Sequence, residues 1–288
     1  MILVTGANGT FGRLVVEHLL SAVPAATLAV SVRDPARAAE LAARGVTVRQ
    51  ADFDAPETVA RAFAGAHTVL VNATNYGTGP SQRRVQHAAA ISAAQAAGAK
   101  RLVVTSFQDL ARCSMPAVAG YAETEAQARS AGLATTVLRL TAGLDTATAR
   151  DVRWAISAGA LIAPAGRARI APPALADLAE AAANVAHEPG HEDTTYELTG
   201  PDAVSWDDLA ALAGSLAGRD LEYRPVPDDE YREHVATLGF PADAVGPLLD
   251  YYAAVRAGWA STPHGDLGRL LHRPPVPALE AVRRASAS

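Results

Sequence analysis

Residues Thr5-Gly6-Ala7-Asn8-Gly9-Thr10-Phe11-Gly12 decide the fold, because they place three glycines at the spacing G-x-x-G-x-x-G between a short apolar run and a helical one. Gly6 permits a tight turn, Gly9 lets the backbone approach a diphosphate, and Gly12 lets helix and strand pack closely. The amides that open such a helix lie at the positive end of its dipole and attract phosphate. We therefore expect a dinucleotide-binding loop, although a glycine triplet alone leaves a plain structural turn as the alternative.

Short apolar runs alternate with longer alanine- and leucine-rich stretches through the first half of the chain. The runs predict strands at residues 2–5, 27–32, 46–50, 68–72, 101–105 and 135–140. The longer stretches predict helices at residues 11–22, 35–43, 56–63, 81–97 and 119–131. This alternation is typical of a parallel sheet with helices on both faces. We expect an α/β fold, a Rossmann-type doubly wound parallel sheet, followed by a small mixed α/β C-terminal substrate lobe.

The alternation weakens after residue 140. Helices are expected at residues 147–158, 174–186, 228–238 and 242–257, and short strands at residues 169–171, 196–199 and 221–224. Ser205 with Asp208 three residues later resembles a capping box and predicts another helix start, and a proline-rich tail ends the chain. We expect residues 1–143, with 172–188 returning to them, to form an NAD(P)-binding Rossmann domain. Residues 144–171 and 189–288 are expected to form the smaller substrate-binding lobe.

The composition excludes several classes of function. A net charge of -5 gives no electrostatic case for binding nucleic acid or an anionic membrane. No apolar stretch approaches the roughly 20 residues of a membrane span, and a strand at the start leaves no room for a signal peptide, so we expect a cytoplasmic protein. Cys113 is the only cysteine and reads as an incidental thiol. His187 and His191 flank a Pro-Gly turn and favour a solvated loop, so no metal site is expected.

The end of the second predicted strand decides between NADPH and NADH. An NAD-binding chain usually has an acidic residue there, about 20 positions after the glycines, to bind the ribose 2′-hydroxyl. Arg33 occupies this place, and its guanidinium suits a 2′-phosphate. Asp34 can serve as the cap of the next helix, with Arg33 as its surface neighbour. NADPH is therefore the preferred cofactor and NADH the alternative.

Other cofactor contacts are expected in the glycine loop and at the carboxyl ends of the later strands, where ligands of parallel sheets lie. We expect the adenine beside Asp52 and Phe53. The ribose and pyrophosphate are expected above Asn72, Ala73 and Thr74. The remaining candidates are Gly6, Asn8, Gly9, Thr10, Phe11, Gly12 and Thr105.

Seven stretches along nearly the whole chain carry a family resemblance. They are Val4-Thr5-Gly6-Ala7-Asn8-Gly9-Thr10-Phe11-Gly12, Ser31-Val32-Arg33-Asp34-Pro35, Gln50-Ala51-Asp52-Phe53-Asp54, Val104-Thr105-Ser106-Phe107, Glu123-Thr124-Glu125 with Leu138-Arg139-Leu140, Tyr196-Glu197-Leu198-Thr199-Gly200-Pro201, and Arg269-Leu270-Leu271-His272-Arg273-Pro274-Pro275. With these stretches the chain resembles the NmrA-like atypical short-chain dehydrogenases/reductases, especially the bacterial NAD(P)H:quinone oxidoreductase and triphenylmethane reductase branch.

The resemblance implies quinone or dye-like acceptors, NADPH and often a dimer, so a homodimer is a candidate assembly. It also implies that Thr141, Ala142 and Gly143 contact the nicotinamide carboxamide. The wider group includes non-catalytic redox sensors, which bind the nucleotide and a protein partner.

Tyr121 is the candidate catalytic tyrosine, but the residue four positions later is Glu125 and not the lysine of ordinary short-chain dehydrogenases. Lys100 is the only lysine and precedes the fifth predicted strand, which disfavours reversible alcohol oxidation. A neutral tyrosine can still donate a hydrogen bond or a proton to an electrophilic acceptor. Plain surface placement on an amphipathic helix is the alternative for Tyr121.

Ser106 and Phe107 follow the fifth predicted strand, where substrate is expected. Ser106 could donate to an acceptor oxygen and Phe107 could stack on a ring; a turn hydroxyl and a core aromatic are the alternatives. The sequence thus predicts an NADPH-dependent reductase that transfers hydride to a quinone or related conjugated or aromatic carbonyl. The alternatives are a non-catalytic dinucleotide sensor and an isomerase or epimerase that uses bound NAD(P).

Overall fold

The computed structural model describes residues 1–72 and 79–287. These residues form two compact units. Unit 1 comprises the described residues of Met1–Phe107, Ala119–Leu140 and Leu178–Glu197. Unit 2 comprises those of Gln108–Val118, Thr141–Asp177 and Leu198–Ser288.

Unit 1 is built on a seven-stranded sheet with the order β3-β2-β1-β4-β5-β6-β9, and every neighbouring pair is parallel. The strands are β1 (Ile2–Thr5), β2 (Leu28–Val32), β3 (Thr47–Gln50), β4 (Thr68–Val71), β5 (Arg101–Phe107), β6 (Ala134–Leu140) and β9 (Thr195–Glu197). The order reverses between β1 and β4, which is the point where doubly wound folds bind dinucleotides.

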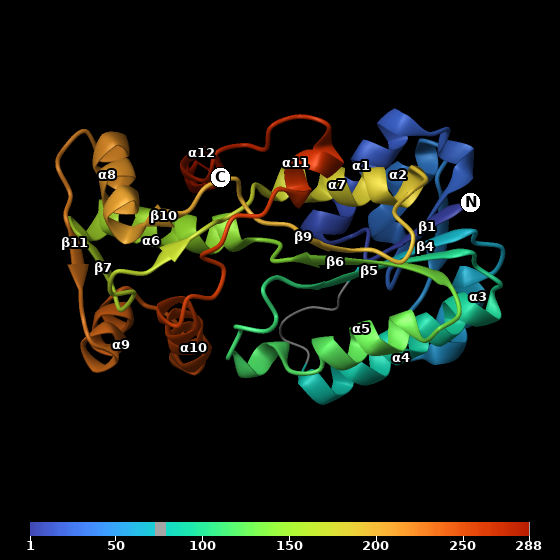
Figure 1. The fold of residues 1–288 in the computed structure, drawn as a ribbon, viewed down its shortest axis with the longest axis horizontal. Coiled ribbons are helices and arrows are strands. Elements are labelled where there is room, and N and C mark those ends of the chain that lie inside the picture. Colours follow the sequence, from blue (N-terminus) through green and yellow to red (C-terminus); the bar gives the residue numbers. More distant parts are fainter. Residues whose placement is uncertain (73–78, 288) are drawn as a thin grey trace. The chain divides into compact units, whose positions relative to one another are not determined.

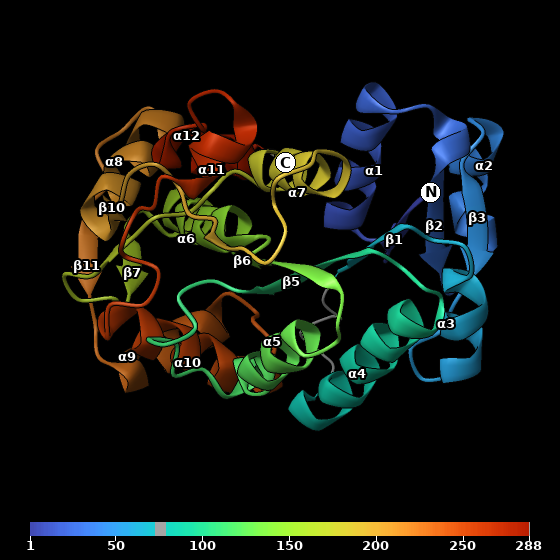
Figure 2. The same ribbon diagram turned by 45° about the vertical axis from the view of Figure 1, so that its right-hand side comes forward.

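Helices cover both faces of this sheet (Figure 1). On one face lie α1 (Thr10–Ala22), α2 (Ala39–Ala43) and α7 (Leu175–His187), and on the other lie α3 (Pro56–Phe63), α4 (Pro80–Ala96) and α5 (Tyr121–Arg129). Figure 2 shows α4 and α5 side by side, in agreement with their mutual contacts. Between the sheet and the helices α3, α4 and α5 lies one apolar cluster that contains Val59, Phe63, Ile91 and Val104. The expected Rossmann-type α/β fold is confirmed.

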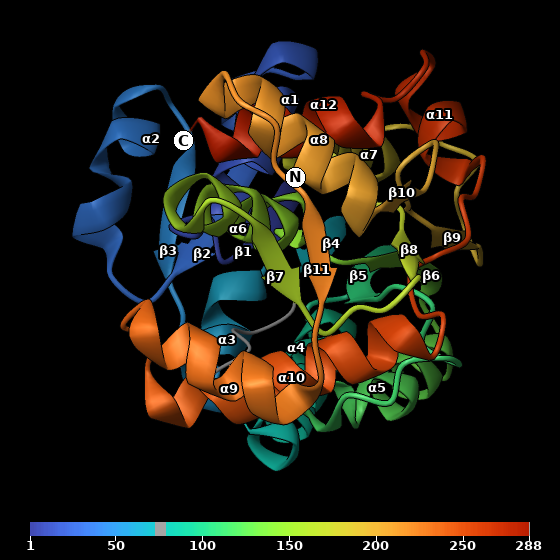
Figure 3. The ribbon, with the colours of Figure 1, turned by 90° about the vertical axis from the view of Figure 1, so that its left-hand side faces the viewer.

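Unit 2 contains two small sheets and most of the remaining helices. β7 (Leu161–Ala163) pairs in parallel with β11 (Tyr223–Pro225), and β8 (Arg169–Ile170) pairs antiparallel with β10 (Val204–Ser205). Figure 3 shows β7 and β11 side by side. The helices are α6 (Leu144–Ala158), α8 (Trp206–Ala217), α9 (Asp228–Thr237), α10 (Val245–Arg256), α11 (Asp266–Leu271) and α12 (Ala278–Ser286). Short 3-10 helices in the two units span Ala25–Thr27, Pro35–Ala38, Pro116–Val118 and Ala242–Ala244.

Two local features differ from the sequence expectation, and a third agrees with it. The short strand β9 pairs with β6 in the main sheet. From the sequence it was expected in the substrate lobe, because a three-residue strand carries no signal for its pairing partner. The proline-rich tail, in which no helix was predicted, contains α11 and α12. Pro277 precedes α12 as its N-cap, and proline is tolerated where a helix begins. The capping box of Ser205 and Asp208 is present as expected.

Two of the stretches that carried the family resemblance hold unit 2 together. A Cβ on Gly200 would lie 2.6 Å from the Pro172 carbonyl oxygen, so the backbone packs there only with glycine. Asp177 accepts hydrogen bonds from the Arg273 side chain at 2.8 Å and from the Val276 amide at 2.7 Å. These contacts give both stretches a structural role.

Buried aromatic residues occupy the interior of unit 2. Trp206 Nε1 and the Tyr252 hydroxyl both donate to Asp151, at 3.0 and 2.7 Å, and Tyr231 and Tyr252 share a hydrogen bond. Trp206 and Tyr252 are therefore core residues with satisfied polar atoms. Among the described residues, no helix is both long and apolar enough to cross a membrane.

Candidate nucleotide site and active site

The glycine loop adopts the strand–turn–helix geometry that its spacing predicts. Gly6 has φ +68°, a conformation that favours glycine, and its amide donates to the Ser31 carbonyl at 3.1 Å. A Cβ on Gly12 would lie 2.9 Å from the Gly6 carbonyl carbon and closer still to its oxygen. Both glycines are thus required by the turn itself. No side chain caps the N-terminus of α1, and the first amides of such a helix can bind an anion.

Gly9 differs from the other two glycines. It has φ -83°, which any residue can adopt, and the nearest atom to a Cβ there is the Gly6 carbonyl oxygen at 3.4 Å. The protein itself therefore tolerates a side chain better at position 9 than at positions 6 and 12. This is the expected pattern where a ligand, rather than the protein, approaches the backbone.

The loop after β2 presents a cation. Arg33 is exposed, and within the described residues its guanidinium forms no ion pair. Asp34 accepts a hydrogen bond from the Ala36 amide at 3.0 Å and caps the following helical turn. This is the capping role that the sequence analysis gave as an alternative for Asp34. The Asn8 side chain donates to the Asp34 carbonyl at 3.1 Å and ties the glycine loop to this loop.

The loop after β3 is fixed by its own polar groups. The Asp52 amide donates to Thr58 Oγ1 at 2.8 Å, and an Asp52 carboxylate oxygen accepts from the Asp54 amide at 3.1 Å. Phe53 is half-buried and packs against the apolar cluster under the sheet. Asp52 and Phe53 thus give the loop a fixed shape at the edge where the adenine is expected.

A short chain of hydrogen bonds joins the ends of three neighbouring strands. The Asn72 amide donates to Thr5 Oγ1 at 2.9 Å, and Thr105 Oγ1 donates to Asn72 Oδ1 at 3.4 Å. Asn72 follows β4, directly beside the point where the strand order reverses. Ala73 and Thr74, which were also expected at the cofactor, lie outside the described residues.

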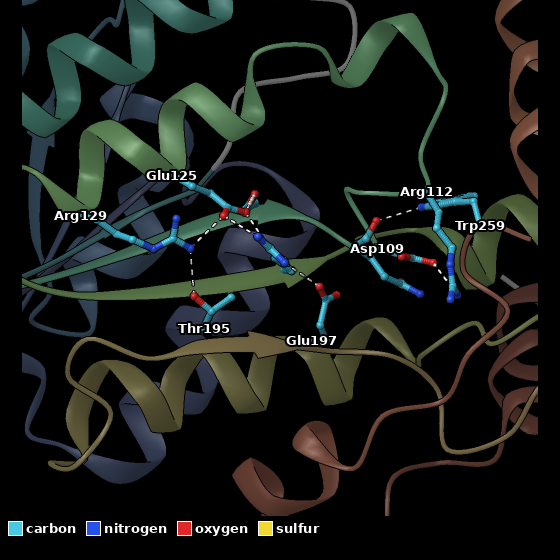
Figure 4. A network of polar contacts seen from close by, with 10 residues as sticks. Asp109, Arg112, Glu125, Arg129, Thr195, Glu197 and Trp259 are labelled. Carbon is cyan, nitrogen blue, oxygen red and sulfur yellow. Dashed lines mark hydrogen bonds and ion pairs between the residues drawn. The ribbon is translucent and has the colours of Figure 1, made fainter.

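Ser106 belongs to a buried ionic network on unit 1, of which Figure 4 labels Glu125, Arg129 and Glu197. Its hydroxyl donates to Glu125 at 2.6 Å, and the same carboxylate accepts two hydrogen bonds from Arg139, both at 2.8 Å. Arg129 adds a third cationic contact at 2.9 Å, and Glu197 pairs with Arg139 at 3.0 Å. The Ser106 hydroxyl proton is thus donated to Glu125, and donation of this hydroxyl to a substrate stays a prediction.

This network explains why Glu125 stands where ordinary short-chain dehydrogenases have lysine. The Glu125 side chain is 2% exposed. Burial works to raise its pKa, but the hydrogen bonds from Arg139, Ser106 and Arg129 outweigh it and hold the pKa below the usual 4.5. An ionised carboxylate in this position anchors α5 to the sheet and offers no activation to Tyr121.

Tyr121 begins α5 and lies among aromatic and cationic side chains. Its ring is 5.8 Å from that of Phe107 and 6.0 Å from that of His87, and the Arg83 guanidinium lies 5.1 Å from its centroid. Burial raises the pKa of Tyr121, with Arg83 working against this, so the phenol stays neutral. The surface placement considered for Tyr121 is wrong, since its side chain is buried. Phe107 is a buried aromatic that packs against it.

Sequence reasoning missed His87 and Arg83. Both are buried on α4, and His87 Nδ1 lies 3.1 Å from Thr124 Oγ1. Burial, with a further contribution from Arg83, lowers the pKa of His87 to about 4, so the imidazole is neutral. The available signal was their spacing of four residues on a helix, which places both side chains on one face.

In unit 2, Thr141 and Gln108 directly follow β6 and β5. Thr141 Oγ1 is buried and has no hydrogen-bond partner in the described chain, and the same holds for both amide atoms of Gln108. Gly143, with φ +87°, is the N-cap of α6, and Ala142 lies between it and Thr141. The contact of Thr141, Ala142 and Gly143 with the nicotinamide carboxamide, which the resemblance implied, stays a prediction.

The described residues contain no group of three or more histidine, cysteine, aspartate or glutamate side chains placed to hold a metal ion. Burial raises the pKa of the Cys113 thiol to about 11, with Asp109 working in the same direction. This thiol is therefore protonated near neutral pH and is a poor nucleophile.

The chain has extensive similarity to known proteins. A family model described as NAD(P)H-binding matches residues 6–189. Quinone oxidoreductase 2 of Escherichia coli (strain K12) is 32% identical over 283 residues, which cover 98% of this chain and 97% of that protein. The chain belongs to the NmrA-like family of NAD(P)H-binding proteins. An NAD(P)H azoreductase of Xenophilus azovorans is 30% identical over 88% of this chain and 86% of that protein.

Solved structures agree with this assignment. Citrobacter sp. triphenylmethane reductase complexed with NADP(H) has a TM-score of 0.92 at 31% identity, with 99% of each chain covered. An NADPH-dependent quinone oxidoreductase from Escherichia coli, complexed with NADPH, has a TM-score of 0.89 at 32% identity and the same coverage. The relatives extend over the full length of the chain, and the protein is an NAD(P)H-dependent reductase.

Proposed function

We propose that this protein uses NADPH to reduce a quinone or a related conjugated or aromatic carbonyl compound. The observation that carries the cofactor half of this proposal is the exposed Arg33 at the end of β2, where an acidic residue would favour NADH. The Asp34 carboxylate is engaged as a helix cap and does not stand in for that acidic residue. A ribose 2′-phosphate would therefore meet a guanidinium, which can bind it through two parallel hydrogen bonds.

The cofactor is held by groups that this chain supplies in fixed positions. The uncapped amides at the start of α1 bind the pyrophosphate, with Gly9 as the point of close approach. Asn8 keeps the Arg33 loop against the glycine loop. Asp52 and Phe53 border the adenine, and Thr141 offers a hydroxyl to the carboxamide. When bound, NADPH supplies the hydride.

The acceptor half of the proposal rests on Tyr121. Reduction of a quinone to a hydroquinone takes up one hydride and one proton, and negative charge develops on the carbonyl oxygen as the hydride arrives. A neutral phenol can donate a hydrogen bond to that oxygen and then a proton, without a lysine to lower its pKa. The relatives named above act, by their names, on quinones, azo compounds and triphenylmethane dyes, which are conjugated acceptors that need little activation.

Calorimetric titration with NADPH and NADH tests the cofactor half. Arg33→Ala is expected to weaken NADPH binding by roughly 10- to 100-fold, the range expected for loss of a charge-assisted hydrogen bond, and to leave NADH binding unchanged. Arg37→Ala is the matched control, because Arg37 is an exposed arginine four residues further along and should change neither affinity. Equal weakening of both cofactors by Arg33→Ala would contradict the NADPH assignment.

Stopped-flow loss of NADPH absorbance with a panel of quinones tests the acceptor half. We expect turnover of several quinones and no oxidation of simple secondary alcohols with NADP as oxidant. A protein that binds NADPH but reduces no acceptor would overturn the reductase proposal and favour the dinucleotide sensor.

A further inference from the structure

Gln108 is a fully buried amide without a hydrogen-bond partner. Gln108 is 0% exposed. In the described chain, its Nε2 has no hydrogen-bond acceptor and its Oε1 has no donor. Its backbone, in contrast, is firmly held, because the buried Trp259 Nε1 donates to the Gln108 carbonyl at 2.9 Å. Burying an amide without partners costs free energy, and native proteins rarely accept that cost unless something else satisfies the group.

The position of Gln108 suggests what that partner is. Phe107 and Leu140 are the last residues of β5 and β6, and they are register partners. Gln108 and Thr141 therefore directly follow the ends of two neighbouring strands. Both have buried polar atoms without partners. In parallel sheets, ligands lie beyond the carboxyl ends of the strands. Two adjacent strand ends thus offer one hydroxyl and one complete amide at the edge where a ligand is expected.

We propose that Gln108 is a specificity-determining residue whose amide binds a ligand group that presents a carbonyl beside a hydrogen-bond donor. Nε2 would donate to the carbonyl, and Oε1 would accept from the donor, so both orphaned atoms would be satisfied together. A plain quinone carbonyl would satisfy only Nε2. The two sources of the required chemistry are the nicotinamide carboxamide and a hydroxylated quinone, in which a hydroxyl stands beside the carbonyl. The second source rests on the proposed function.

Because Gln108 is fully buried, binding of a ligand to its side-chain amide requires a local rearrangement. The segment Gln108–Val118 contains a single 3-10 turn and no strand, so it has little regular structure to resist a local rearrangement. We expect hydrogen exchange in residues 109–118 to slow when the correct ligand binds, while Trp259 keeps the Gln108 backbone in place.

The first test uses the ligand-free protein and Gln108→Met, which keeps the length of the side chain and removes the orphaned amide. We expect Tm to rise by roughly 2–4 °C, because a buried, unsatisfied group is replaced by an apolar one. Gln95→Met is the matched control: the Gln95 amide donates to the Ala131 carbonyl at 2.6 Å, so its loss should lower Tm. A lower Tm for Gln108→Met would show a structural role and overturn the proposal.

The second test assigns the source. In the cofactor arm, NADPH is compared by calorimetry with its acetylpyridine analogue, in which a methyl group replaces the carboxamide nitrogen. In the substrate arm, kcat/KM for naphthoquinone is compared with that for its peri-hydroxy derivative. The wild type should discriminate by about tenfold in one arm, and Gln108→Met should lose that discrimination. The ligand is identified by the arm in which Gln108→Met loses the discrimination that the wild type shows.

Unchanged discrimination in both arms would overturn the role of Gln108. Binding of adenosine 2′,5′-bisphosphate, which lacks the nicotinamide, serves as the reference and should be equal in both proteins. If the wild type binds NADPH and reduces quinones, that result would leave the proposed function standing and refute only this inference.

Discussion

Ser106 and Gln108 lie two residues apart where β5 ends, and their polar groups have opposite surroundings. The Ser106 hydroxyl is donated to Glu125, which is in turn bound by Arg139 and Arg129. The Gln108 amide has no partner at all in the described chain. A buried polar side chain that is hydrogen-bonded within the protein stabilises the fold. A buried polar side chain without such a hydrogen bond is available to a ligand. The following experiments test that distinction.

Glu125→Ala is expected to give the largest effect. Removing the carboxylate leaves Arg139 without its main partner and Ser106 without an acceptor, so we expect a loss of about 3–5 kcal/mol in the free energy of unfolding. Glu197→Ala is the control, since Glu197 is 20% exposed and makes one contact with the same arginine; it should cost about 1 kcal/mol. Urea denaturation measures both. Equal losses would mean that burial of Glu125 contributes nothing special.

Acidification should reveal two separate losses of stability. His87 has a pKa lowered from 6.5 to about 4, so the unfolded chain binds its proton more readily and stability falls as the pH drops from 6.5 toward 4, by about 3 kcal/mol at most. Glu125 has a pKa below 4.5 in the folded chain, so its contribution is complete above pH 4.5 and is lost below it. His87→Phe keeps a ring beside Tyr121. This variant should abolish the loss of stability between pH 6.5 and 4 and leave the loss below pH 4.5 that is due to Glu125. Equilibrium unfolding at a series of pH values checks this, and an unchanged upper window would refute the assignment to His87.

Alanine at two positions of the glycine loop should separate fold from binding. Gly12→Ala should lower stability by about 2 kcal/mol, since its Cβ has no room beside Gly6. Gly9→Ala should change stability much less but weaken NADPH binding, because the new methyl group stands where the pyrophosphate approaches. Thermal unfolding and calorimetry on both variants give the comparison. Normal NADPH affinity in Gly9→Ala would contradict the proposed place of the pyrophosphate.

Tyr121→Phe should have the smallest effect. The ring contacts with Phe107 and His87 are retained, so stability should stay nearly constant. The lost hydrogen bond to the developing oxyanion should lower kcat by roughly tenfold, at the low end for such donors, because solvent can supply the proton. Steady-state kinetics with one quinone measures it. A KM that rises while kcat stays constant would instead indicate that Tyr121 only binds the substrate.

Local signals in the sequence predicted the features that depend on neighbouring residues. Alternating apolar runs and helical stretches predicted the strands and helices of unit 1, because both faces of a parallel sheet must be covered. Asp34 stood immediately before a proline and could be recognised as a candidate cap. The absence of lysine after Tyr121 needed no structure. These conclusions come from residues at most a few positions apart.

Contacts between distant segments could not be predicted in the same way. Glu125 meets Arg139 and Ser106 across 14 and 19 residues, and no spacing rule links them. For that reason, Ser106 was predicted to donate to the substrate and its contact with Glu125 was missed. His87 and Arg83 were overlooked because a histidine and an arginine on an alanine-rich helix are usually solvated.

The sequence by itself determined that this chain builds a Rossmann-type sheet with a phosphate-binding turn after its first strand, because glycine spacing and hydrophobic period are properties of adjacent residues. Only the tertiary structure decided which polar side chains are already paired. That information depends on which strand ends and helix faces come together. It separates Ser106, whose hydroxyl is bound to a buried carboxylate, from Gln108, whose side-chain amide has no hydrogen-bond partner among the described residues.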